Sequence, residues 1–318
     1  MSHPKIKFKY RIEYAAVVVF EWIFRILPYW MGIGLAWLIA RFAFHVLRFR
    51  RKEAERRIRQ VFGDHISKRE IKRIEWLSIR NTLFNIAELM SIGTITDQWI
   101  ERHCNGAKKS IDDLNAILKE GHGGILALPH LGNWDLAGIV VAHGGIPIFS
   151  IAGVQHNPLT NDWINRKRAT GITILERGTS AIRQVIRRLR GNEILAILPD
   201  VRMKTPDLPT DFLGAKANLG RGMASFSHAT GAPIMLAKIR RNGISRHDLA
   251  VSDPIYPDKS LDTDADVRRM TDLVMHAIDA EIRAEPGQWF WYNKRWVLDP
   301  LTENASNEAS KTPTRQSK

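Results

Sequence analysis

A histidine and an aspartate stand five positions apart at the end of the apolar stretch that begins at Gly123. His130 follows Pro129 directly, and Asp135 lies shortly after Asn133. An imidazole can act as a general base near neutral pH, and a carboxylate can hold one ring nitrogen while the other stays free. The pair therefore predicts general-base chemistry. A surface histidine beside a helix-capping aspartate is the alternative interpretation, because the spacing alone is a short motif.

The neighbouring residues predict the elements that would position this pair. Residues 125–128 form an apolar run typical of a short buried strand, and Pro129 ends it because proline cannot donate to a central sheet. Asn133 is a good N-cap for a helix that carries Asp135 in its first turn, where the helix dipole favours the ionised carboxylate. We therefore expect His130 on a strand-to-helix turn, with Asp135 folded back onto its ring.

The rest of the chain alternates short apolar segments with amphipathic ones. The segments expected to form strands are 147–151, 172–175, 193–198, 233–239 and 248–252, and those expected to form helices include 112–119, 156–168 and 179–189. Strands that alternate with helices predict an α/β sheet. Functional sites in such folds lie at the carboxyl ends of the strands.

Several charged residues fall near that same rim of the predicted sheet. Arg166 and Arg168 end the helix after the second strand, Arg177 follows the third strand, and Asp200 follows the fourth. Guanidinium groups bind phosphates bidentately, so the three arginines are candidate substrate-binding residues, with ordinary surface charge as the alternative. Asp200 could orient a base or a sugar hydroxyl, or simply cap a turn. No histidine, cysteine and carboxylate grouping has metal-ligand spacing, so we expect neither a metal nor a cofactor.

The ordered set of motifs resembles the lipid A biosynthesis late acyltransferases, within the HxxxxD acyltransferase superfamily. The motifs that carry the resemblance are Leu128–Pro129–His130, Gly132–Asn133–Trp134–Asp135, Leu198–Pro199–Asp200, Phe212–Leu213–Gly214, Gly231–Ala232–Pro233 and Pro286–Gly287–Gln288–Trp289–Phe290–Trp291. The mycobacterial phosphatidylinositol mannoside acyltransferase lies in the same branch. Two positions depart from the lipid A pattern: Asp135 often has Glu as its counterpart, and Asn293 stands where a His usually precedes two basic residues. These departures bear on the substrate more than on the chemistry.

The resemblance implies an open mixed sheet flanked by helices, as in glycerolipid acyltransferases, and an O-acyltransferase activity. His130 would take a proton from an acceptor hydroxyl, which attacks an acyl thioester, and Asp135 would orient His130. The expected donor is an acyl carrier protein, with acyl-coenzyme A as the alternative. The expected acceptor is a lipid A precursor or similar glycolipid at the cytoplasmic face of the inner membrane. An acyl-coenzyme A-dependent enzyme of the mannoside type is the alternative. No serine in a GxSxG setting supports a covalent acyl-enzyme.

Composition bears on location and on rival functions. The 318 residues carry a net charge of +14 and one cysteine, Cys104, which excludes an internal disulfide. Such a basic chain attracts anionic lipid, acidic proteins or nucleic acid. A basic protein that only binds membranes or nucleic acid is therefore a rival, although no aromatic-basic RNA motif appears and we expect no nucleic-acid partner. An esterase that uses the same histidine is a third interpretation.

The N-terminal region predicts membrane attachment. Residues 14–47 are strongly apolar and rich in tryptophan, but their longest charge-free run, 26–40, is 15 residues, short of the roughly 20 of a spanning helix. Basic residues flank the region on both sides, which favours a helical hairpin or in-plane amphipathic helices. A buried hairpin of a soluble protein is the alternative. We expect membrane-anchoring helices over 1–50, an α/β acyltransferase domain over 51–300 and a disordered tail over 301–318.

Overall fold

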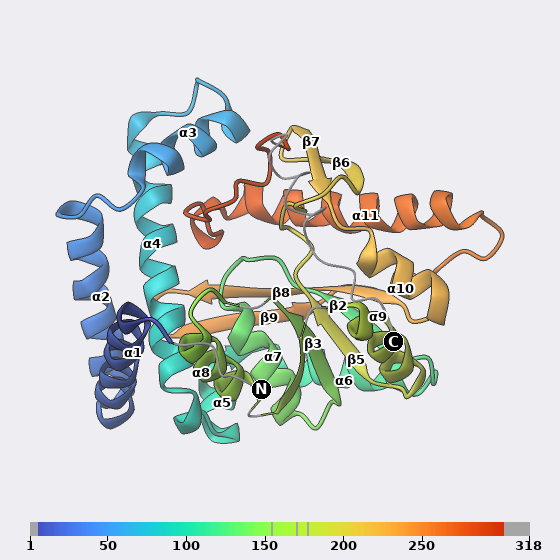
Figure 1. The fold of residues 1–318 in the computed structure, drawn as a ribbon, viewed down its shortest axis with the longest axis horizontal. Helices are drawn as coiled ribbons and strands as arrows, with labels where there is room; N and C mark the ends of the chain where they lie inside the picture. The colour runs from blue at the N-terminus through green and yellow to red at the C-terminus, as the bar shows by residue number, and fades with distance from the viewer. Residues whose placement is uncertain (1–5, 154, 170, 177, 302–318) are drawn as a thin grey trace.

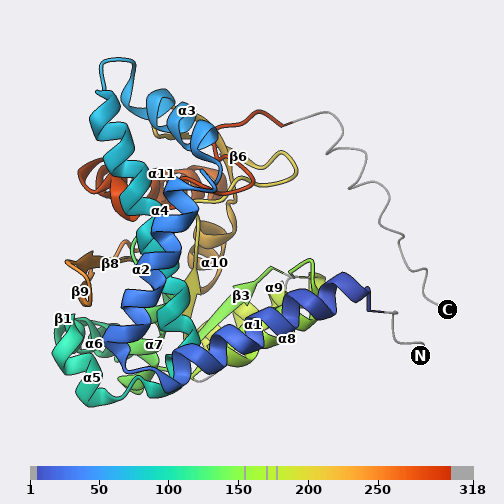
Figure 2. The ribbon, with the colours of Figure 1, turned by 90° about the vertical axis from the view of Figure 1, so that its left-hand side faces the viewer.

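The computed structural model describes residues 6–301, apart from 154, 170 and 177. Its first third is helical. The elements are α1 (Phe8–Ile26), α2 (Tyr29–His45), α3 (Arg51–Phe62), α4 (Lys68–Met90), the 3-10 turn η1 (Ile92–Thr94) and α5 (Asp97–His103). Pro28, which is the N-cap of α2, separates α1 from α2. Figure 1 shows these helices along one side of the molecule, and Figure 2 shows α1 and α2 diverging from their junction on the face toward the viewer.

A mixed sheet forms the centre of the molecule. Its seven strands are β1 (Cys104–Asn105), β2 (Gly124–Ala127), β3 (Ile148–Ala152), β4 (Ile172–Glu176), β5 (Ile194–Ile197), β8 (Ile234–Asn242) and β9 (Arg246–Val251), in the spatial order β1-β9-β8-β2-β5-β3-β4. The strand β2 is central and runs parallel to both of its neighbours, β5 and β8. Among the strands that the structure describes in this sheet, only β8 and β9 pair antiparallel. The predicted mixed α/β sheet is thus confirmed.

Helices cover both faces of the sheet. They are α6 (Ala107–Leu118), α7 (Trp134–His143), α8 (Pro158–Arg168), α9 (Thr179–Arg190), α10 (Gly222–Thr230) and α11 (Thr263–Ala284), followed by the 3-10 turn η2 (Pro286–Gln288). Ile125 and Ala127 of β2 contribute to the core on the side of α10 and α11, and Leu126 contributes to the core on the side of α6 and α7. A strand buried on both faces must be apolar throughout, which explains the continuous run after Gly124.

A two-stranded hairpin follows Asp200 in the chain. It consists of β6 (Leu208–Phe212) and β7 (Ala215–Leu219), which pair antiparallel. The turn places Leu213 at φ 54° and Gly214 at φ 83°. A two-residue hairpin turn needs positive φ at both positions, and leucine there gives no signal in the sequence. The backbone N–H of Leu213 donates to Asp279 of α11 at 2.9 Å, which fixes the turn.

The N-terminal helices pack against the α/β part of the chain. Phe24 and Ile33 share a buried apolar cluster with Phe84 and Met90 of α4. Within the described part of the chain, no helix is both long and apolar enough to cross a bilayer. Most of the expected tail, 302–318, lies outside the described residues.

Candidate active site

The ring of His130 lies at the carboxyl end of β2 and is bound by Asp200. Its Nδ1 lies 2.8 Å from Asp200 Oδ1, and its backbone N–H donates to Asp200 Oδ2 at 2.8 Å. The two residues meet because β2 and β5 are adjacent parallel strands, so that the chain segments after both strands leave the same edge of the sheet. Of the roles predicted for Asp200, the orientation of a base is the one that this contact supports.

Trp289, from the C-terminal segment, completes the surroundings of Asp200. The indole N–H of Trp289 donates to Asp200 Oδ2 at 2.9 Å. The carboxylate is fully buried, and burial alone would raise its pKa. The charge of His130 and the hydrogen bonds from His130 and Trp289 outweigh burial and hold the pKa of Asp200 below its usual value. Asp200 is therefore an ionised acceptor at neutral pH.

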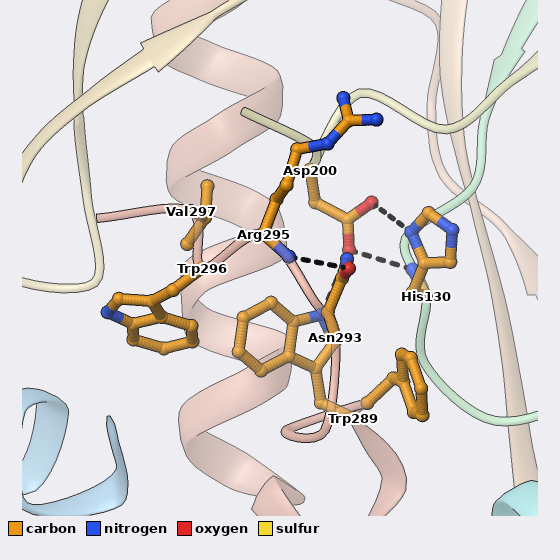
Figure 3. Close-up of a pocket in the computed structure, with 8 residues that line it drawn as sticks. His130, Asp200, Trp289, Asn293, Arg295, Trp296 and Val297 are labelled. Atoms are coloured by element: carbon orange, nitrogen blue, oxygen red, sulfur yellow. Dashed lines mark hydrogen bonds and ion pairs between the residues drawn. The ribbon is translucent and has the colours of Figure 1, made fainter. Parts of the chain in front are cut away.

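This arrangement defines the chemistry that His130 can perform. When Nδ1 carries the proton donated to Asp200, Nε2 keeps its lone pair. Within the described residues Nε2 has no hydrogen-bond partner, and Figure 3 shows it on the side of the ring away from Asp200. The side chain of His130 is 23% exposed, so a substrate can reach it. His130 can therefore act as a general base with Asp200 as its orienting carboxylate.

The prediction that Asp135 folds back onto the ring of His130 is wrong. Asp135 lies in the first turn of α7, as predicted, and Asn133 caps that helix through a bond from the Leu136 N–H at 3.1 Å. Both oxygens of Asp135 accept from Arg168, at 2.7 Å from Nε and 3.3 Å from a terminal nitrogen. Arg168 ends α8, so Asp135 joins α7 to α8, while the ring of His130 turns toward the end of β5.

The other predicted substrate-binding arginines have different environments. Arg166 is exposed, and its guanidinium lies 3.4 Å from the Tyr14 hydroxyl of α1. Arg168 is engaged by Asp135, as described above. Arg177 lies outside the described residues. A phosphate-binding role for these arginines remains a prediction.

A pocket beside His130 is walled mainly by the C-terminal segment. Its lining comprises His130, Asp200, Trp289, Phe290, Asn293, Arg295, Trp296 and Val297 (Figure 3). The Phe290 N–H donates to the His130 carbonyl at 3.2 Å, and Leu131 forms an antiparallel bridge with Trp289. Arg57, which is buried in α3, donates from Nη1 to the carbonyls of Trp291 and Asn293 at 2.7 Å each. These bonds fix the C-terminal segment against the residues that follow β2 and against α3.

Trp289 and Arg295 are the residues that sequence reasoning missed. Trp291 and Trp296 are buried and close to each other, with ring centroids 5.9 Å apart. Trp289 is also buried, but its indole N–H faces a carboxylate. Arg295 is exposed at the rim of the pocket. No spacing rule links residues 159 and 165 positions after the histidine to it, and only the strand arrangement brings them together.

Within the described residues no group of histidines, cysteines and carboxylates could hold a metal ion. The fold and the site together define an α/β protein in which a strand-end histidine is prepared as a base by a buried carboxylate.

Comparison with known proteins is consistent with this class. The family model described as bacterial lipid A biosynthesis acyltransferase matches residues 1–297, and the chain belongs to that family.

Individual relatives lie in the mycobacterial branch. The chain is 27% identical over 220 residues to the phosphatidylinositol mannoside acyltransferase of Mycobacterium tuberculosis strain H37Rv, a match that covers 67% of this chain and 66% of that protein. The protein of the same name from Mycolicibacterium smegmatis is 26% identical over 196 residues, which cover 59% of this chain and 62% of the relative. The chain thus spans somewhat less than two thirds of the length of these relatives.

Proposed function

We propose that this protein transfers a fatty acyl chain from a thioester to a hydroxyl group of a glycolipid. The observation that carries the proposal is the ring of His130, held by Asp200 through Nδ1 and accessible at Nε2. A histidine oriented in this way can deprotonate a hydroxyl group as it attacks a carbonyl. The family to which the chain belongs supports an acyl group as the moiety transferred.

In the proposed reaction, the acceptor oxygen loses its proton to His130 Nε2 as it attacks the thioester carbonyl. The carbon–sulfur bond of the tetrahedral intermediate then breaks, and the proton on Nε2 passes to the leaving thiolate. Asp200 stabilises the positive charge that His130 carries between the two steps. Arg295, at the rim of the same pocket, is the candidate group to stabilise the negative oxygen.

The substrates are proposed from the lining of the site and from the comparisons. Trp289, Phe290 and Val297 form an apolar side of the pocket next to His130, and the acyl chain is proposed to approach His130 along this side. A lipid A precursor is the proposed acceptor because the family model is described by lipid A biosynthesis, and an acyl carrier protein is the proposed donor because an acidic carrier suits a chain with a net charge of +14. The mycobacterial relatives favour a second candidate acceptor, a phosphatidylinositol mannoside.

The proposed location is the cytoplasmic face of the inner membrane, with α1 and α2 lying in the plane of the lipid surface. These helices expose large apolar side chains, among them Phe8 at 76%, Trp22 at 63% and Trp30 at 73%. Tryptophan prefers the membrane–water interface, and an exposed apolar patch of this extent favours lipid contact. Figure 2 shows α1 and α2 on one face of the molecule.

A direct test uses the purified full chain with labelled acyl carrier protein, labelled acyl-coenzyme A and a panel of lipid acceptors. The proposal expects label in the lipid product, dependent on His130. Release of free fatty acid without a lipid product would identify an esterase instead. Binding to lipid with neither reaction would leave a binding protein.

A further inference from the structure

A carboxylate of α4, Glu88, lies at the centre of a buried polar cluster behind the catalytic loop. Its side chain is 1% exposed. Oε1 accepts from the Tyr29 hydroxyl at 2.8 Å and from Arg241 at 2.8 Å, and it lies 3.2 Å from His247 Nε2. Oε2 accepts from Arg241 at 2.6 Å and from the Asn133 amide at 2.6 Å. One carboxylate therefore joins α2, the N-cap of α7, β8 and β9.

Electrostatics keep this carboxylate ionised. Burial would raise the pKa of Glu88, but the charges of Arg241 and His247 and their hydrogen bonds outweigh burial and hold it far below its usual value. Arg241 is fully buried as well, with 0% of its side chain exposed. A buried ion pair contributes little net stability compared with apolar packing, but loss of one partner leaves the other uncompensated. The Glu88–Arg241 pair is therefore suited to holding α4 and β8 in one arrangement.

The cluster holds the loop between His130 and α7 from both sides of Gly132. The Asn85 amide donates to the Gly132 carbonyl at 2.5 Å, and Asn85 in turn accepts from Arg241 at 2.8 Å. On the other side, the Gly132 N–H donates to the Gln288 carbonyl at 2.9 Å. The side chain of Gln288 is bound to the backbone of Arg241 at 2.8 Å and 3.2 Å.

Gly132 itself shows how closely the loop is fitted. Its φ is 64°, and a Cβ there would lie 1.7 Å from the carbonyl oxygen of Ile239 in β8. The loop therefore rests directly on the strand that carries Arg241. Any shift of that strand or of the Glu88 side chain moves the chain immediately after His130.

We propose that Glu88 is a positioning residue for the transfer reaction. Through Asn133, and through Arg241 and Asn85, it fixes the loop that directs the ring of His130 toward Asp200. The catalytic part of this inference rests on the proposed function. Because Tyr29 begins α2, one of the helices proposed to contact lipid, the support of the catalytic loop includes the proposed membrane-facing hairpin.

The test compares Glu88→Gln with a matched variant of another buried carboxylate. Asp266 of α11 is also fully buried and holds His228 at 2.8 Å and Arg269 at 2.6 Å, and no bond joins it to the loop 130–135 in the part of the chain the structure describes. Asp266→Asn should lower the melting temperature but leave kcat per folded molecule unchanged. Glu88→Gln should lower kcat about 10-fold to 100-fold, the cost of a small misplacement of a catalytic group, with the apparent KM within about 2-fold.

A second measurement does not require turnover. The Nδ1 proton of His130, hydrogen-bonded to Asp200, should give a distinct low-field proton resonance, assigned by its loss in His130→Ala. Glu88→Gln should shift or broaden this resonance, and Asp266→Asn should leave it in place. If the wild-type protein shows the resonance but no acyl transfer, the proposed function fails while the positioning inference is still tested by the spectrum.

Tyr29→Phe tests the same inference if Glu88→Gln does not fold. It removes one donor to Glu88 and little volume, so we expect a folded protein with a smaller fall in kcat, about 3-fold to 10-fold from the loss of one hydrogen bond to a charged group, and a perturbed His130 resonance. A Tyr29→Phe protein with both wild-type kcat and a wild-type resonance would overturn the inference. The inference is equally overturned if Glu88→Gln folds and only its melting temperature changes.

Discussion

His130 has two nitrogen atoms with different surroundings, and this asymmetry is the basis of the proposed catalysis. Nδ1 is bound to the buried Asp200, and Nε2 is accessible. The sequence predicted Asp135 as the partner, because it lies in the first turn of the helix that follows His130. In the structure Asp135 binds Arg168 instead. Asp200 therefore orients the histidine, whereas Asp135 links two helices.

The first prediction ranks the three residues. His130→Ala should lower kcat by about 10³-fold or more, because the base is lost. Asp200→Asn should lower it by about 10²-fold or more, because the ring loses its orienting carboxylate. Asp135→Asn should cost less than Asp200→Asn. Steady-state kinetics on folded variants check this order, and a larger loss for Asp135→Asn than for Asp200→Asn would contradict the assignment.

The second prediction concerns Trp289, whose indole N–H donates to Asp200. Trp289→Phe keeps an aromatic ring in the core but removes the donor, so the pKa of Asp200 should rise and kcat should fall about 10-fold, as expected for one hydrogen bond to a charged group. Trp163→Phe, which removes the indole N–H that donates to Glu21 and lies outside the pocket lining, is the matched control and should retain kcat. Equal activity of the two variants would show that the bond to Asp200 does not matter.

The third prediction concerns stability in acid. Asp200 and Glu88 have folded-state pKa values below their usual values of 3.8 and 4.5. Their contribution to the free energy of unfolding is therefore fully present above those values and is lost as the pH falls below them. Asp200→Asn should be less stable than wild type at pH 7, and the difference should shrink as the pH falls from about 4.5 toward 3. Urea unfolding across this range measures it, and a constant difference would refute this linkage.

At the scale of elements, the basic end of α8 connects this helix to α1 and α7. Arg166 contacts Tyr14 of α1, Lys167 pairs with Glu21 of α1, and Arg168 binds Asp135 of α7. The two arginines that the sequence offered equally as phosphate ligands are thus no longer equivalent. Arg166 is exposed, whereas Arg168 joins two helices.

The fourth prediction follows from that difference. Arg168→Gln should lower activity on phosphorylated and dephosphorylated acceptors alike, because Asp135 loses its partner. Arg166→Gln should raise the apparent KM about 5-fold for the phosphorylated acceptor only, as expected for one screened charge contact. Kinetics with the two acceptors test both variants. If Arg166→Gln affects both acceptors equally, it is ordinary surface charge.

The α1–α2 hairpin is the second element with a testable role. A deletion of residues 1–47 would expose Phe84 and Met90 of α4, so substitutions on the outer face are the cleaner experiment. Trp22→Ser combined with Trp30→Ser should lower binding to anionic vesicles about 10-fold or more. Ile244→Ser, at a residue 60% exposed in the β8–β9 turn, is the control and should bind normally. Unchanged vesicle binding of the double variant would contradict an interfacial hairpin.

At the scale of the whole molecule, the net charge of +14 bears on the thioester donor. Acyl carrier proteins are acidic, so a basic surface should speed their encounter with the enzyme in a salt-dependent way. The helix α9 exposes Arg183, Arg187 and Arg190, which make no ion pair with the other described residues. In Figure 1 it lies on the opposite side of the molecule from α1 and α2.

The last prediction uses this charge. Acyl carrier protein donors should outperform acyl-coenzyme A at low salt, and the advantage should shrink as the screening length falls from about 30 Å to about 8 Å. Arg183→Glu combined with Arg187→Glu should reduce kcat/KM for the carrier protein more than Lys108→Glu combined with Lys119→Glu, at two positions on and directly after α6, across the sheet. A preference for acyl-coenzyme A at every salt concentration would overturn the donor assignment.

The local sequence determined the elements around the motif. The apolar run, Pro129 and Asn133 predicted a strand, a turn and a capped helix, and the structure has β2, the loop and α7 at these positions. These features depend on hydrogen bonds and side-chain preferences within a few residues. The position of Asp200 after a predicted strand also placed it near His130, because sheet geometry constrains strand ends even before the strand order is known.

Tertiary structure alone decided which groups touch. Because β2 and β5 are adjacent, Asp200 contacts His130. Arg168 at the end of α8 binds Asp135, and Trp289, which is 159 residues after the histidine in the chain, donates to Asp200. The sequence does not distinguish Glu88 from the other charged residues of α4. Its burial results from the packing of α4 against α2, the start of α7, β8 and β9. Sequence patterns report periodicity and propensity within an element, whereas contacts between distant side chains depend on how complete elements pack, and that information is not contained in the spacing of residues along the chain.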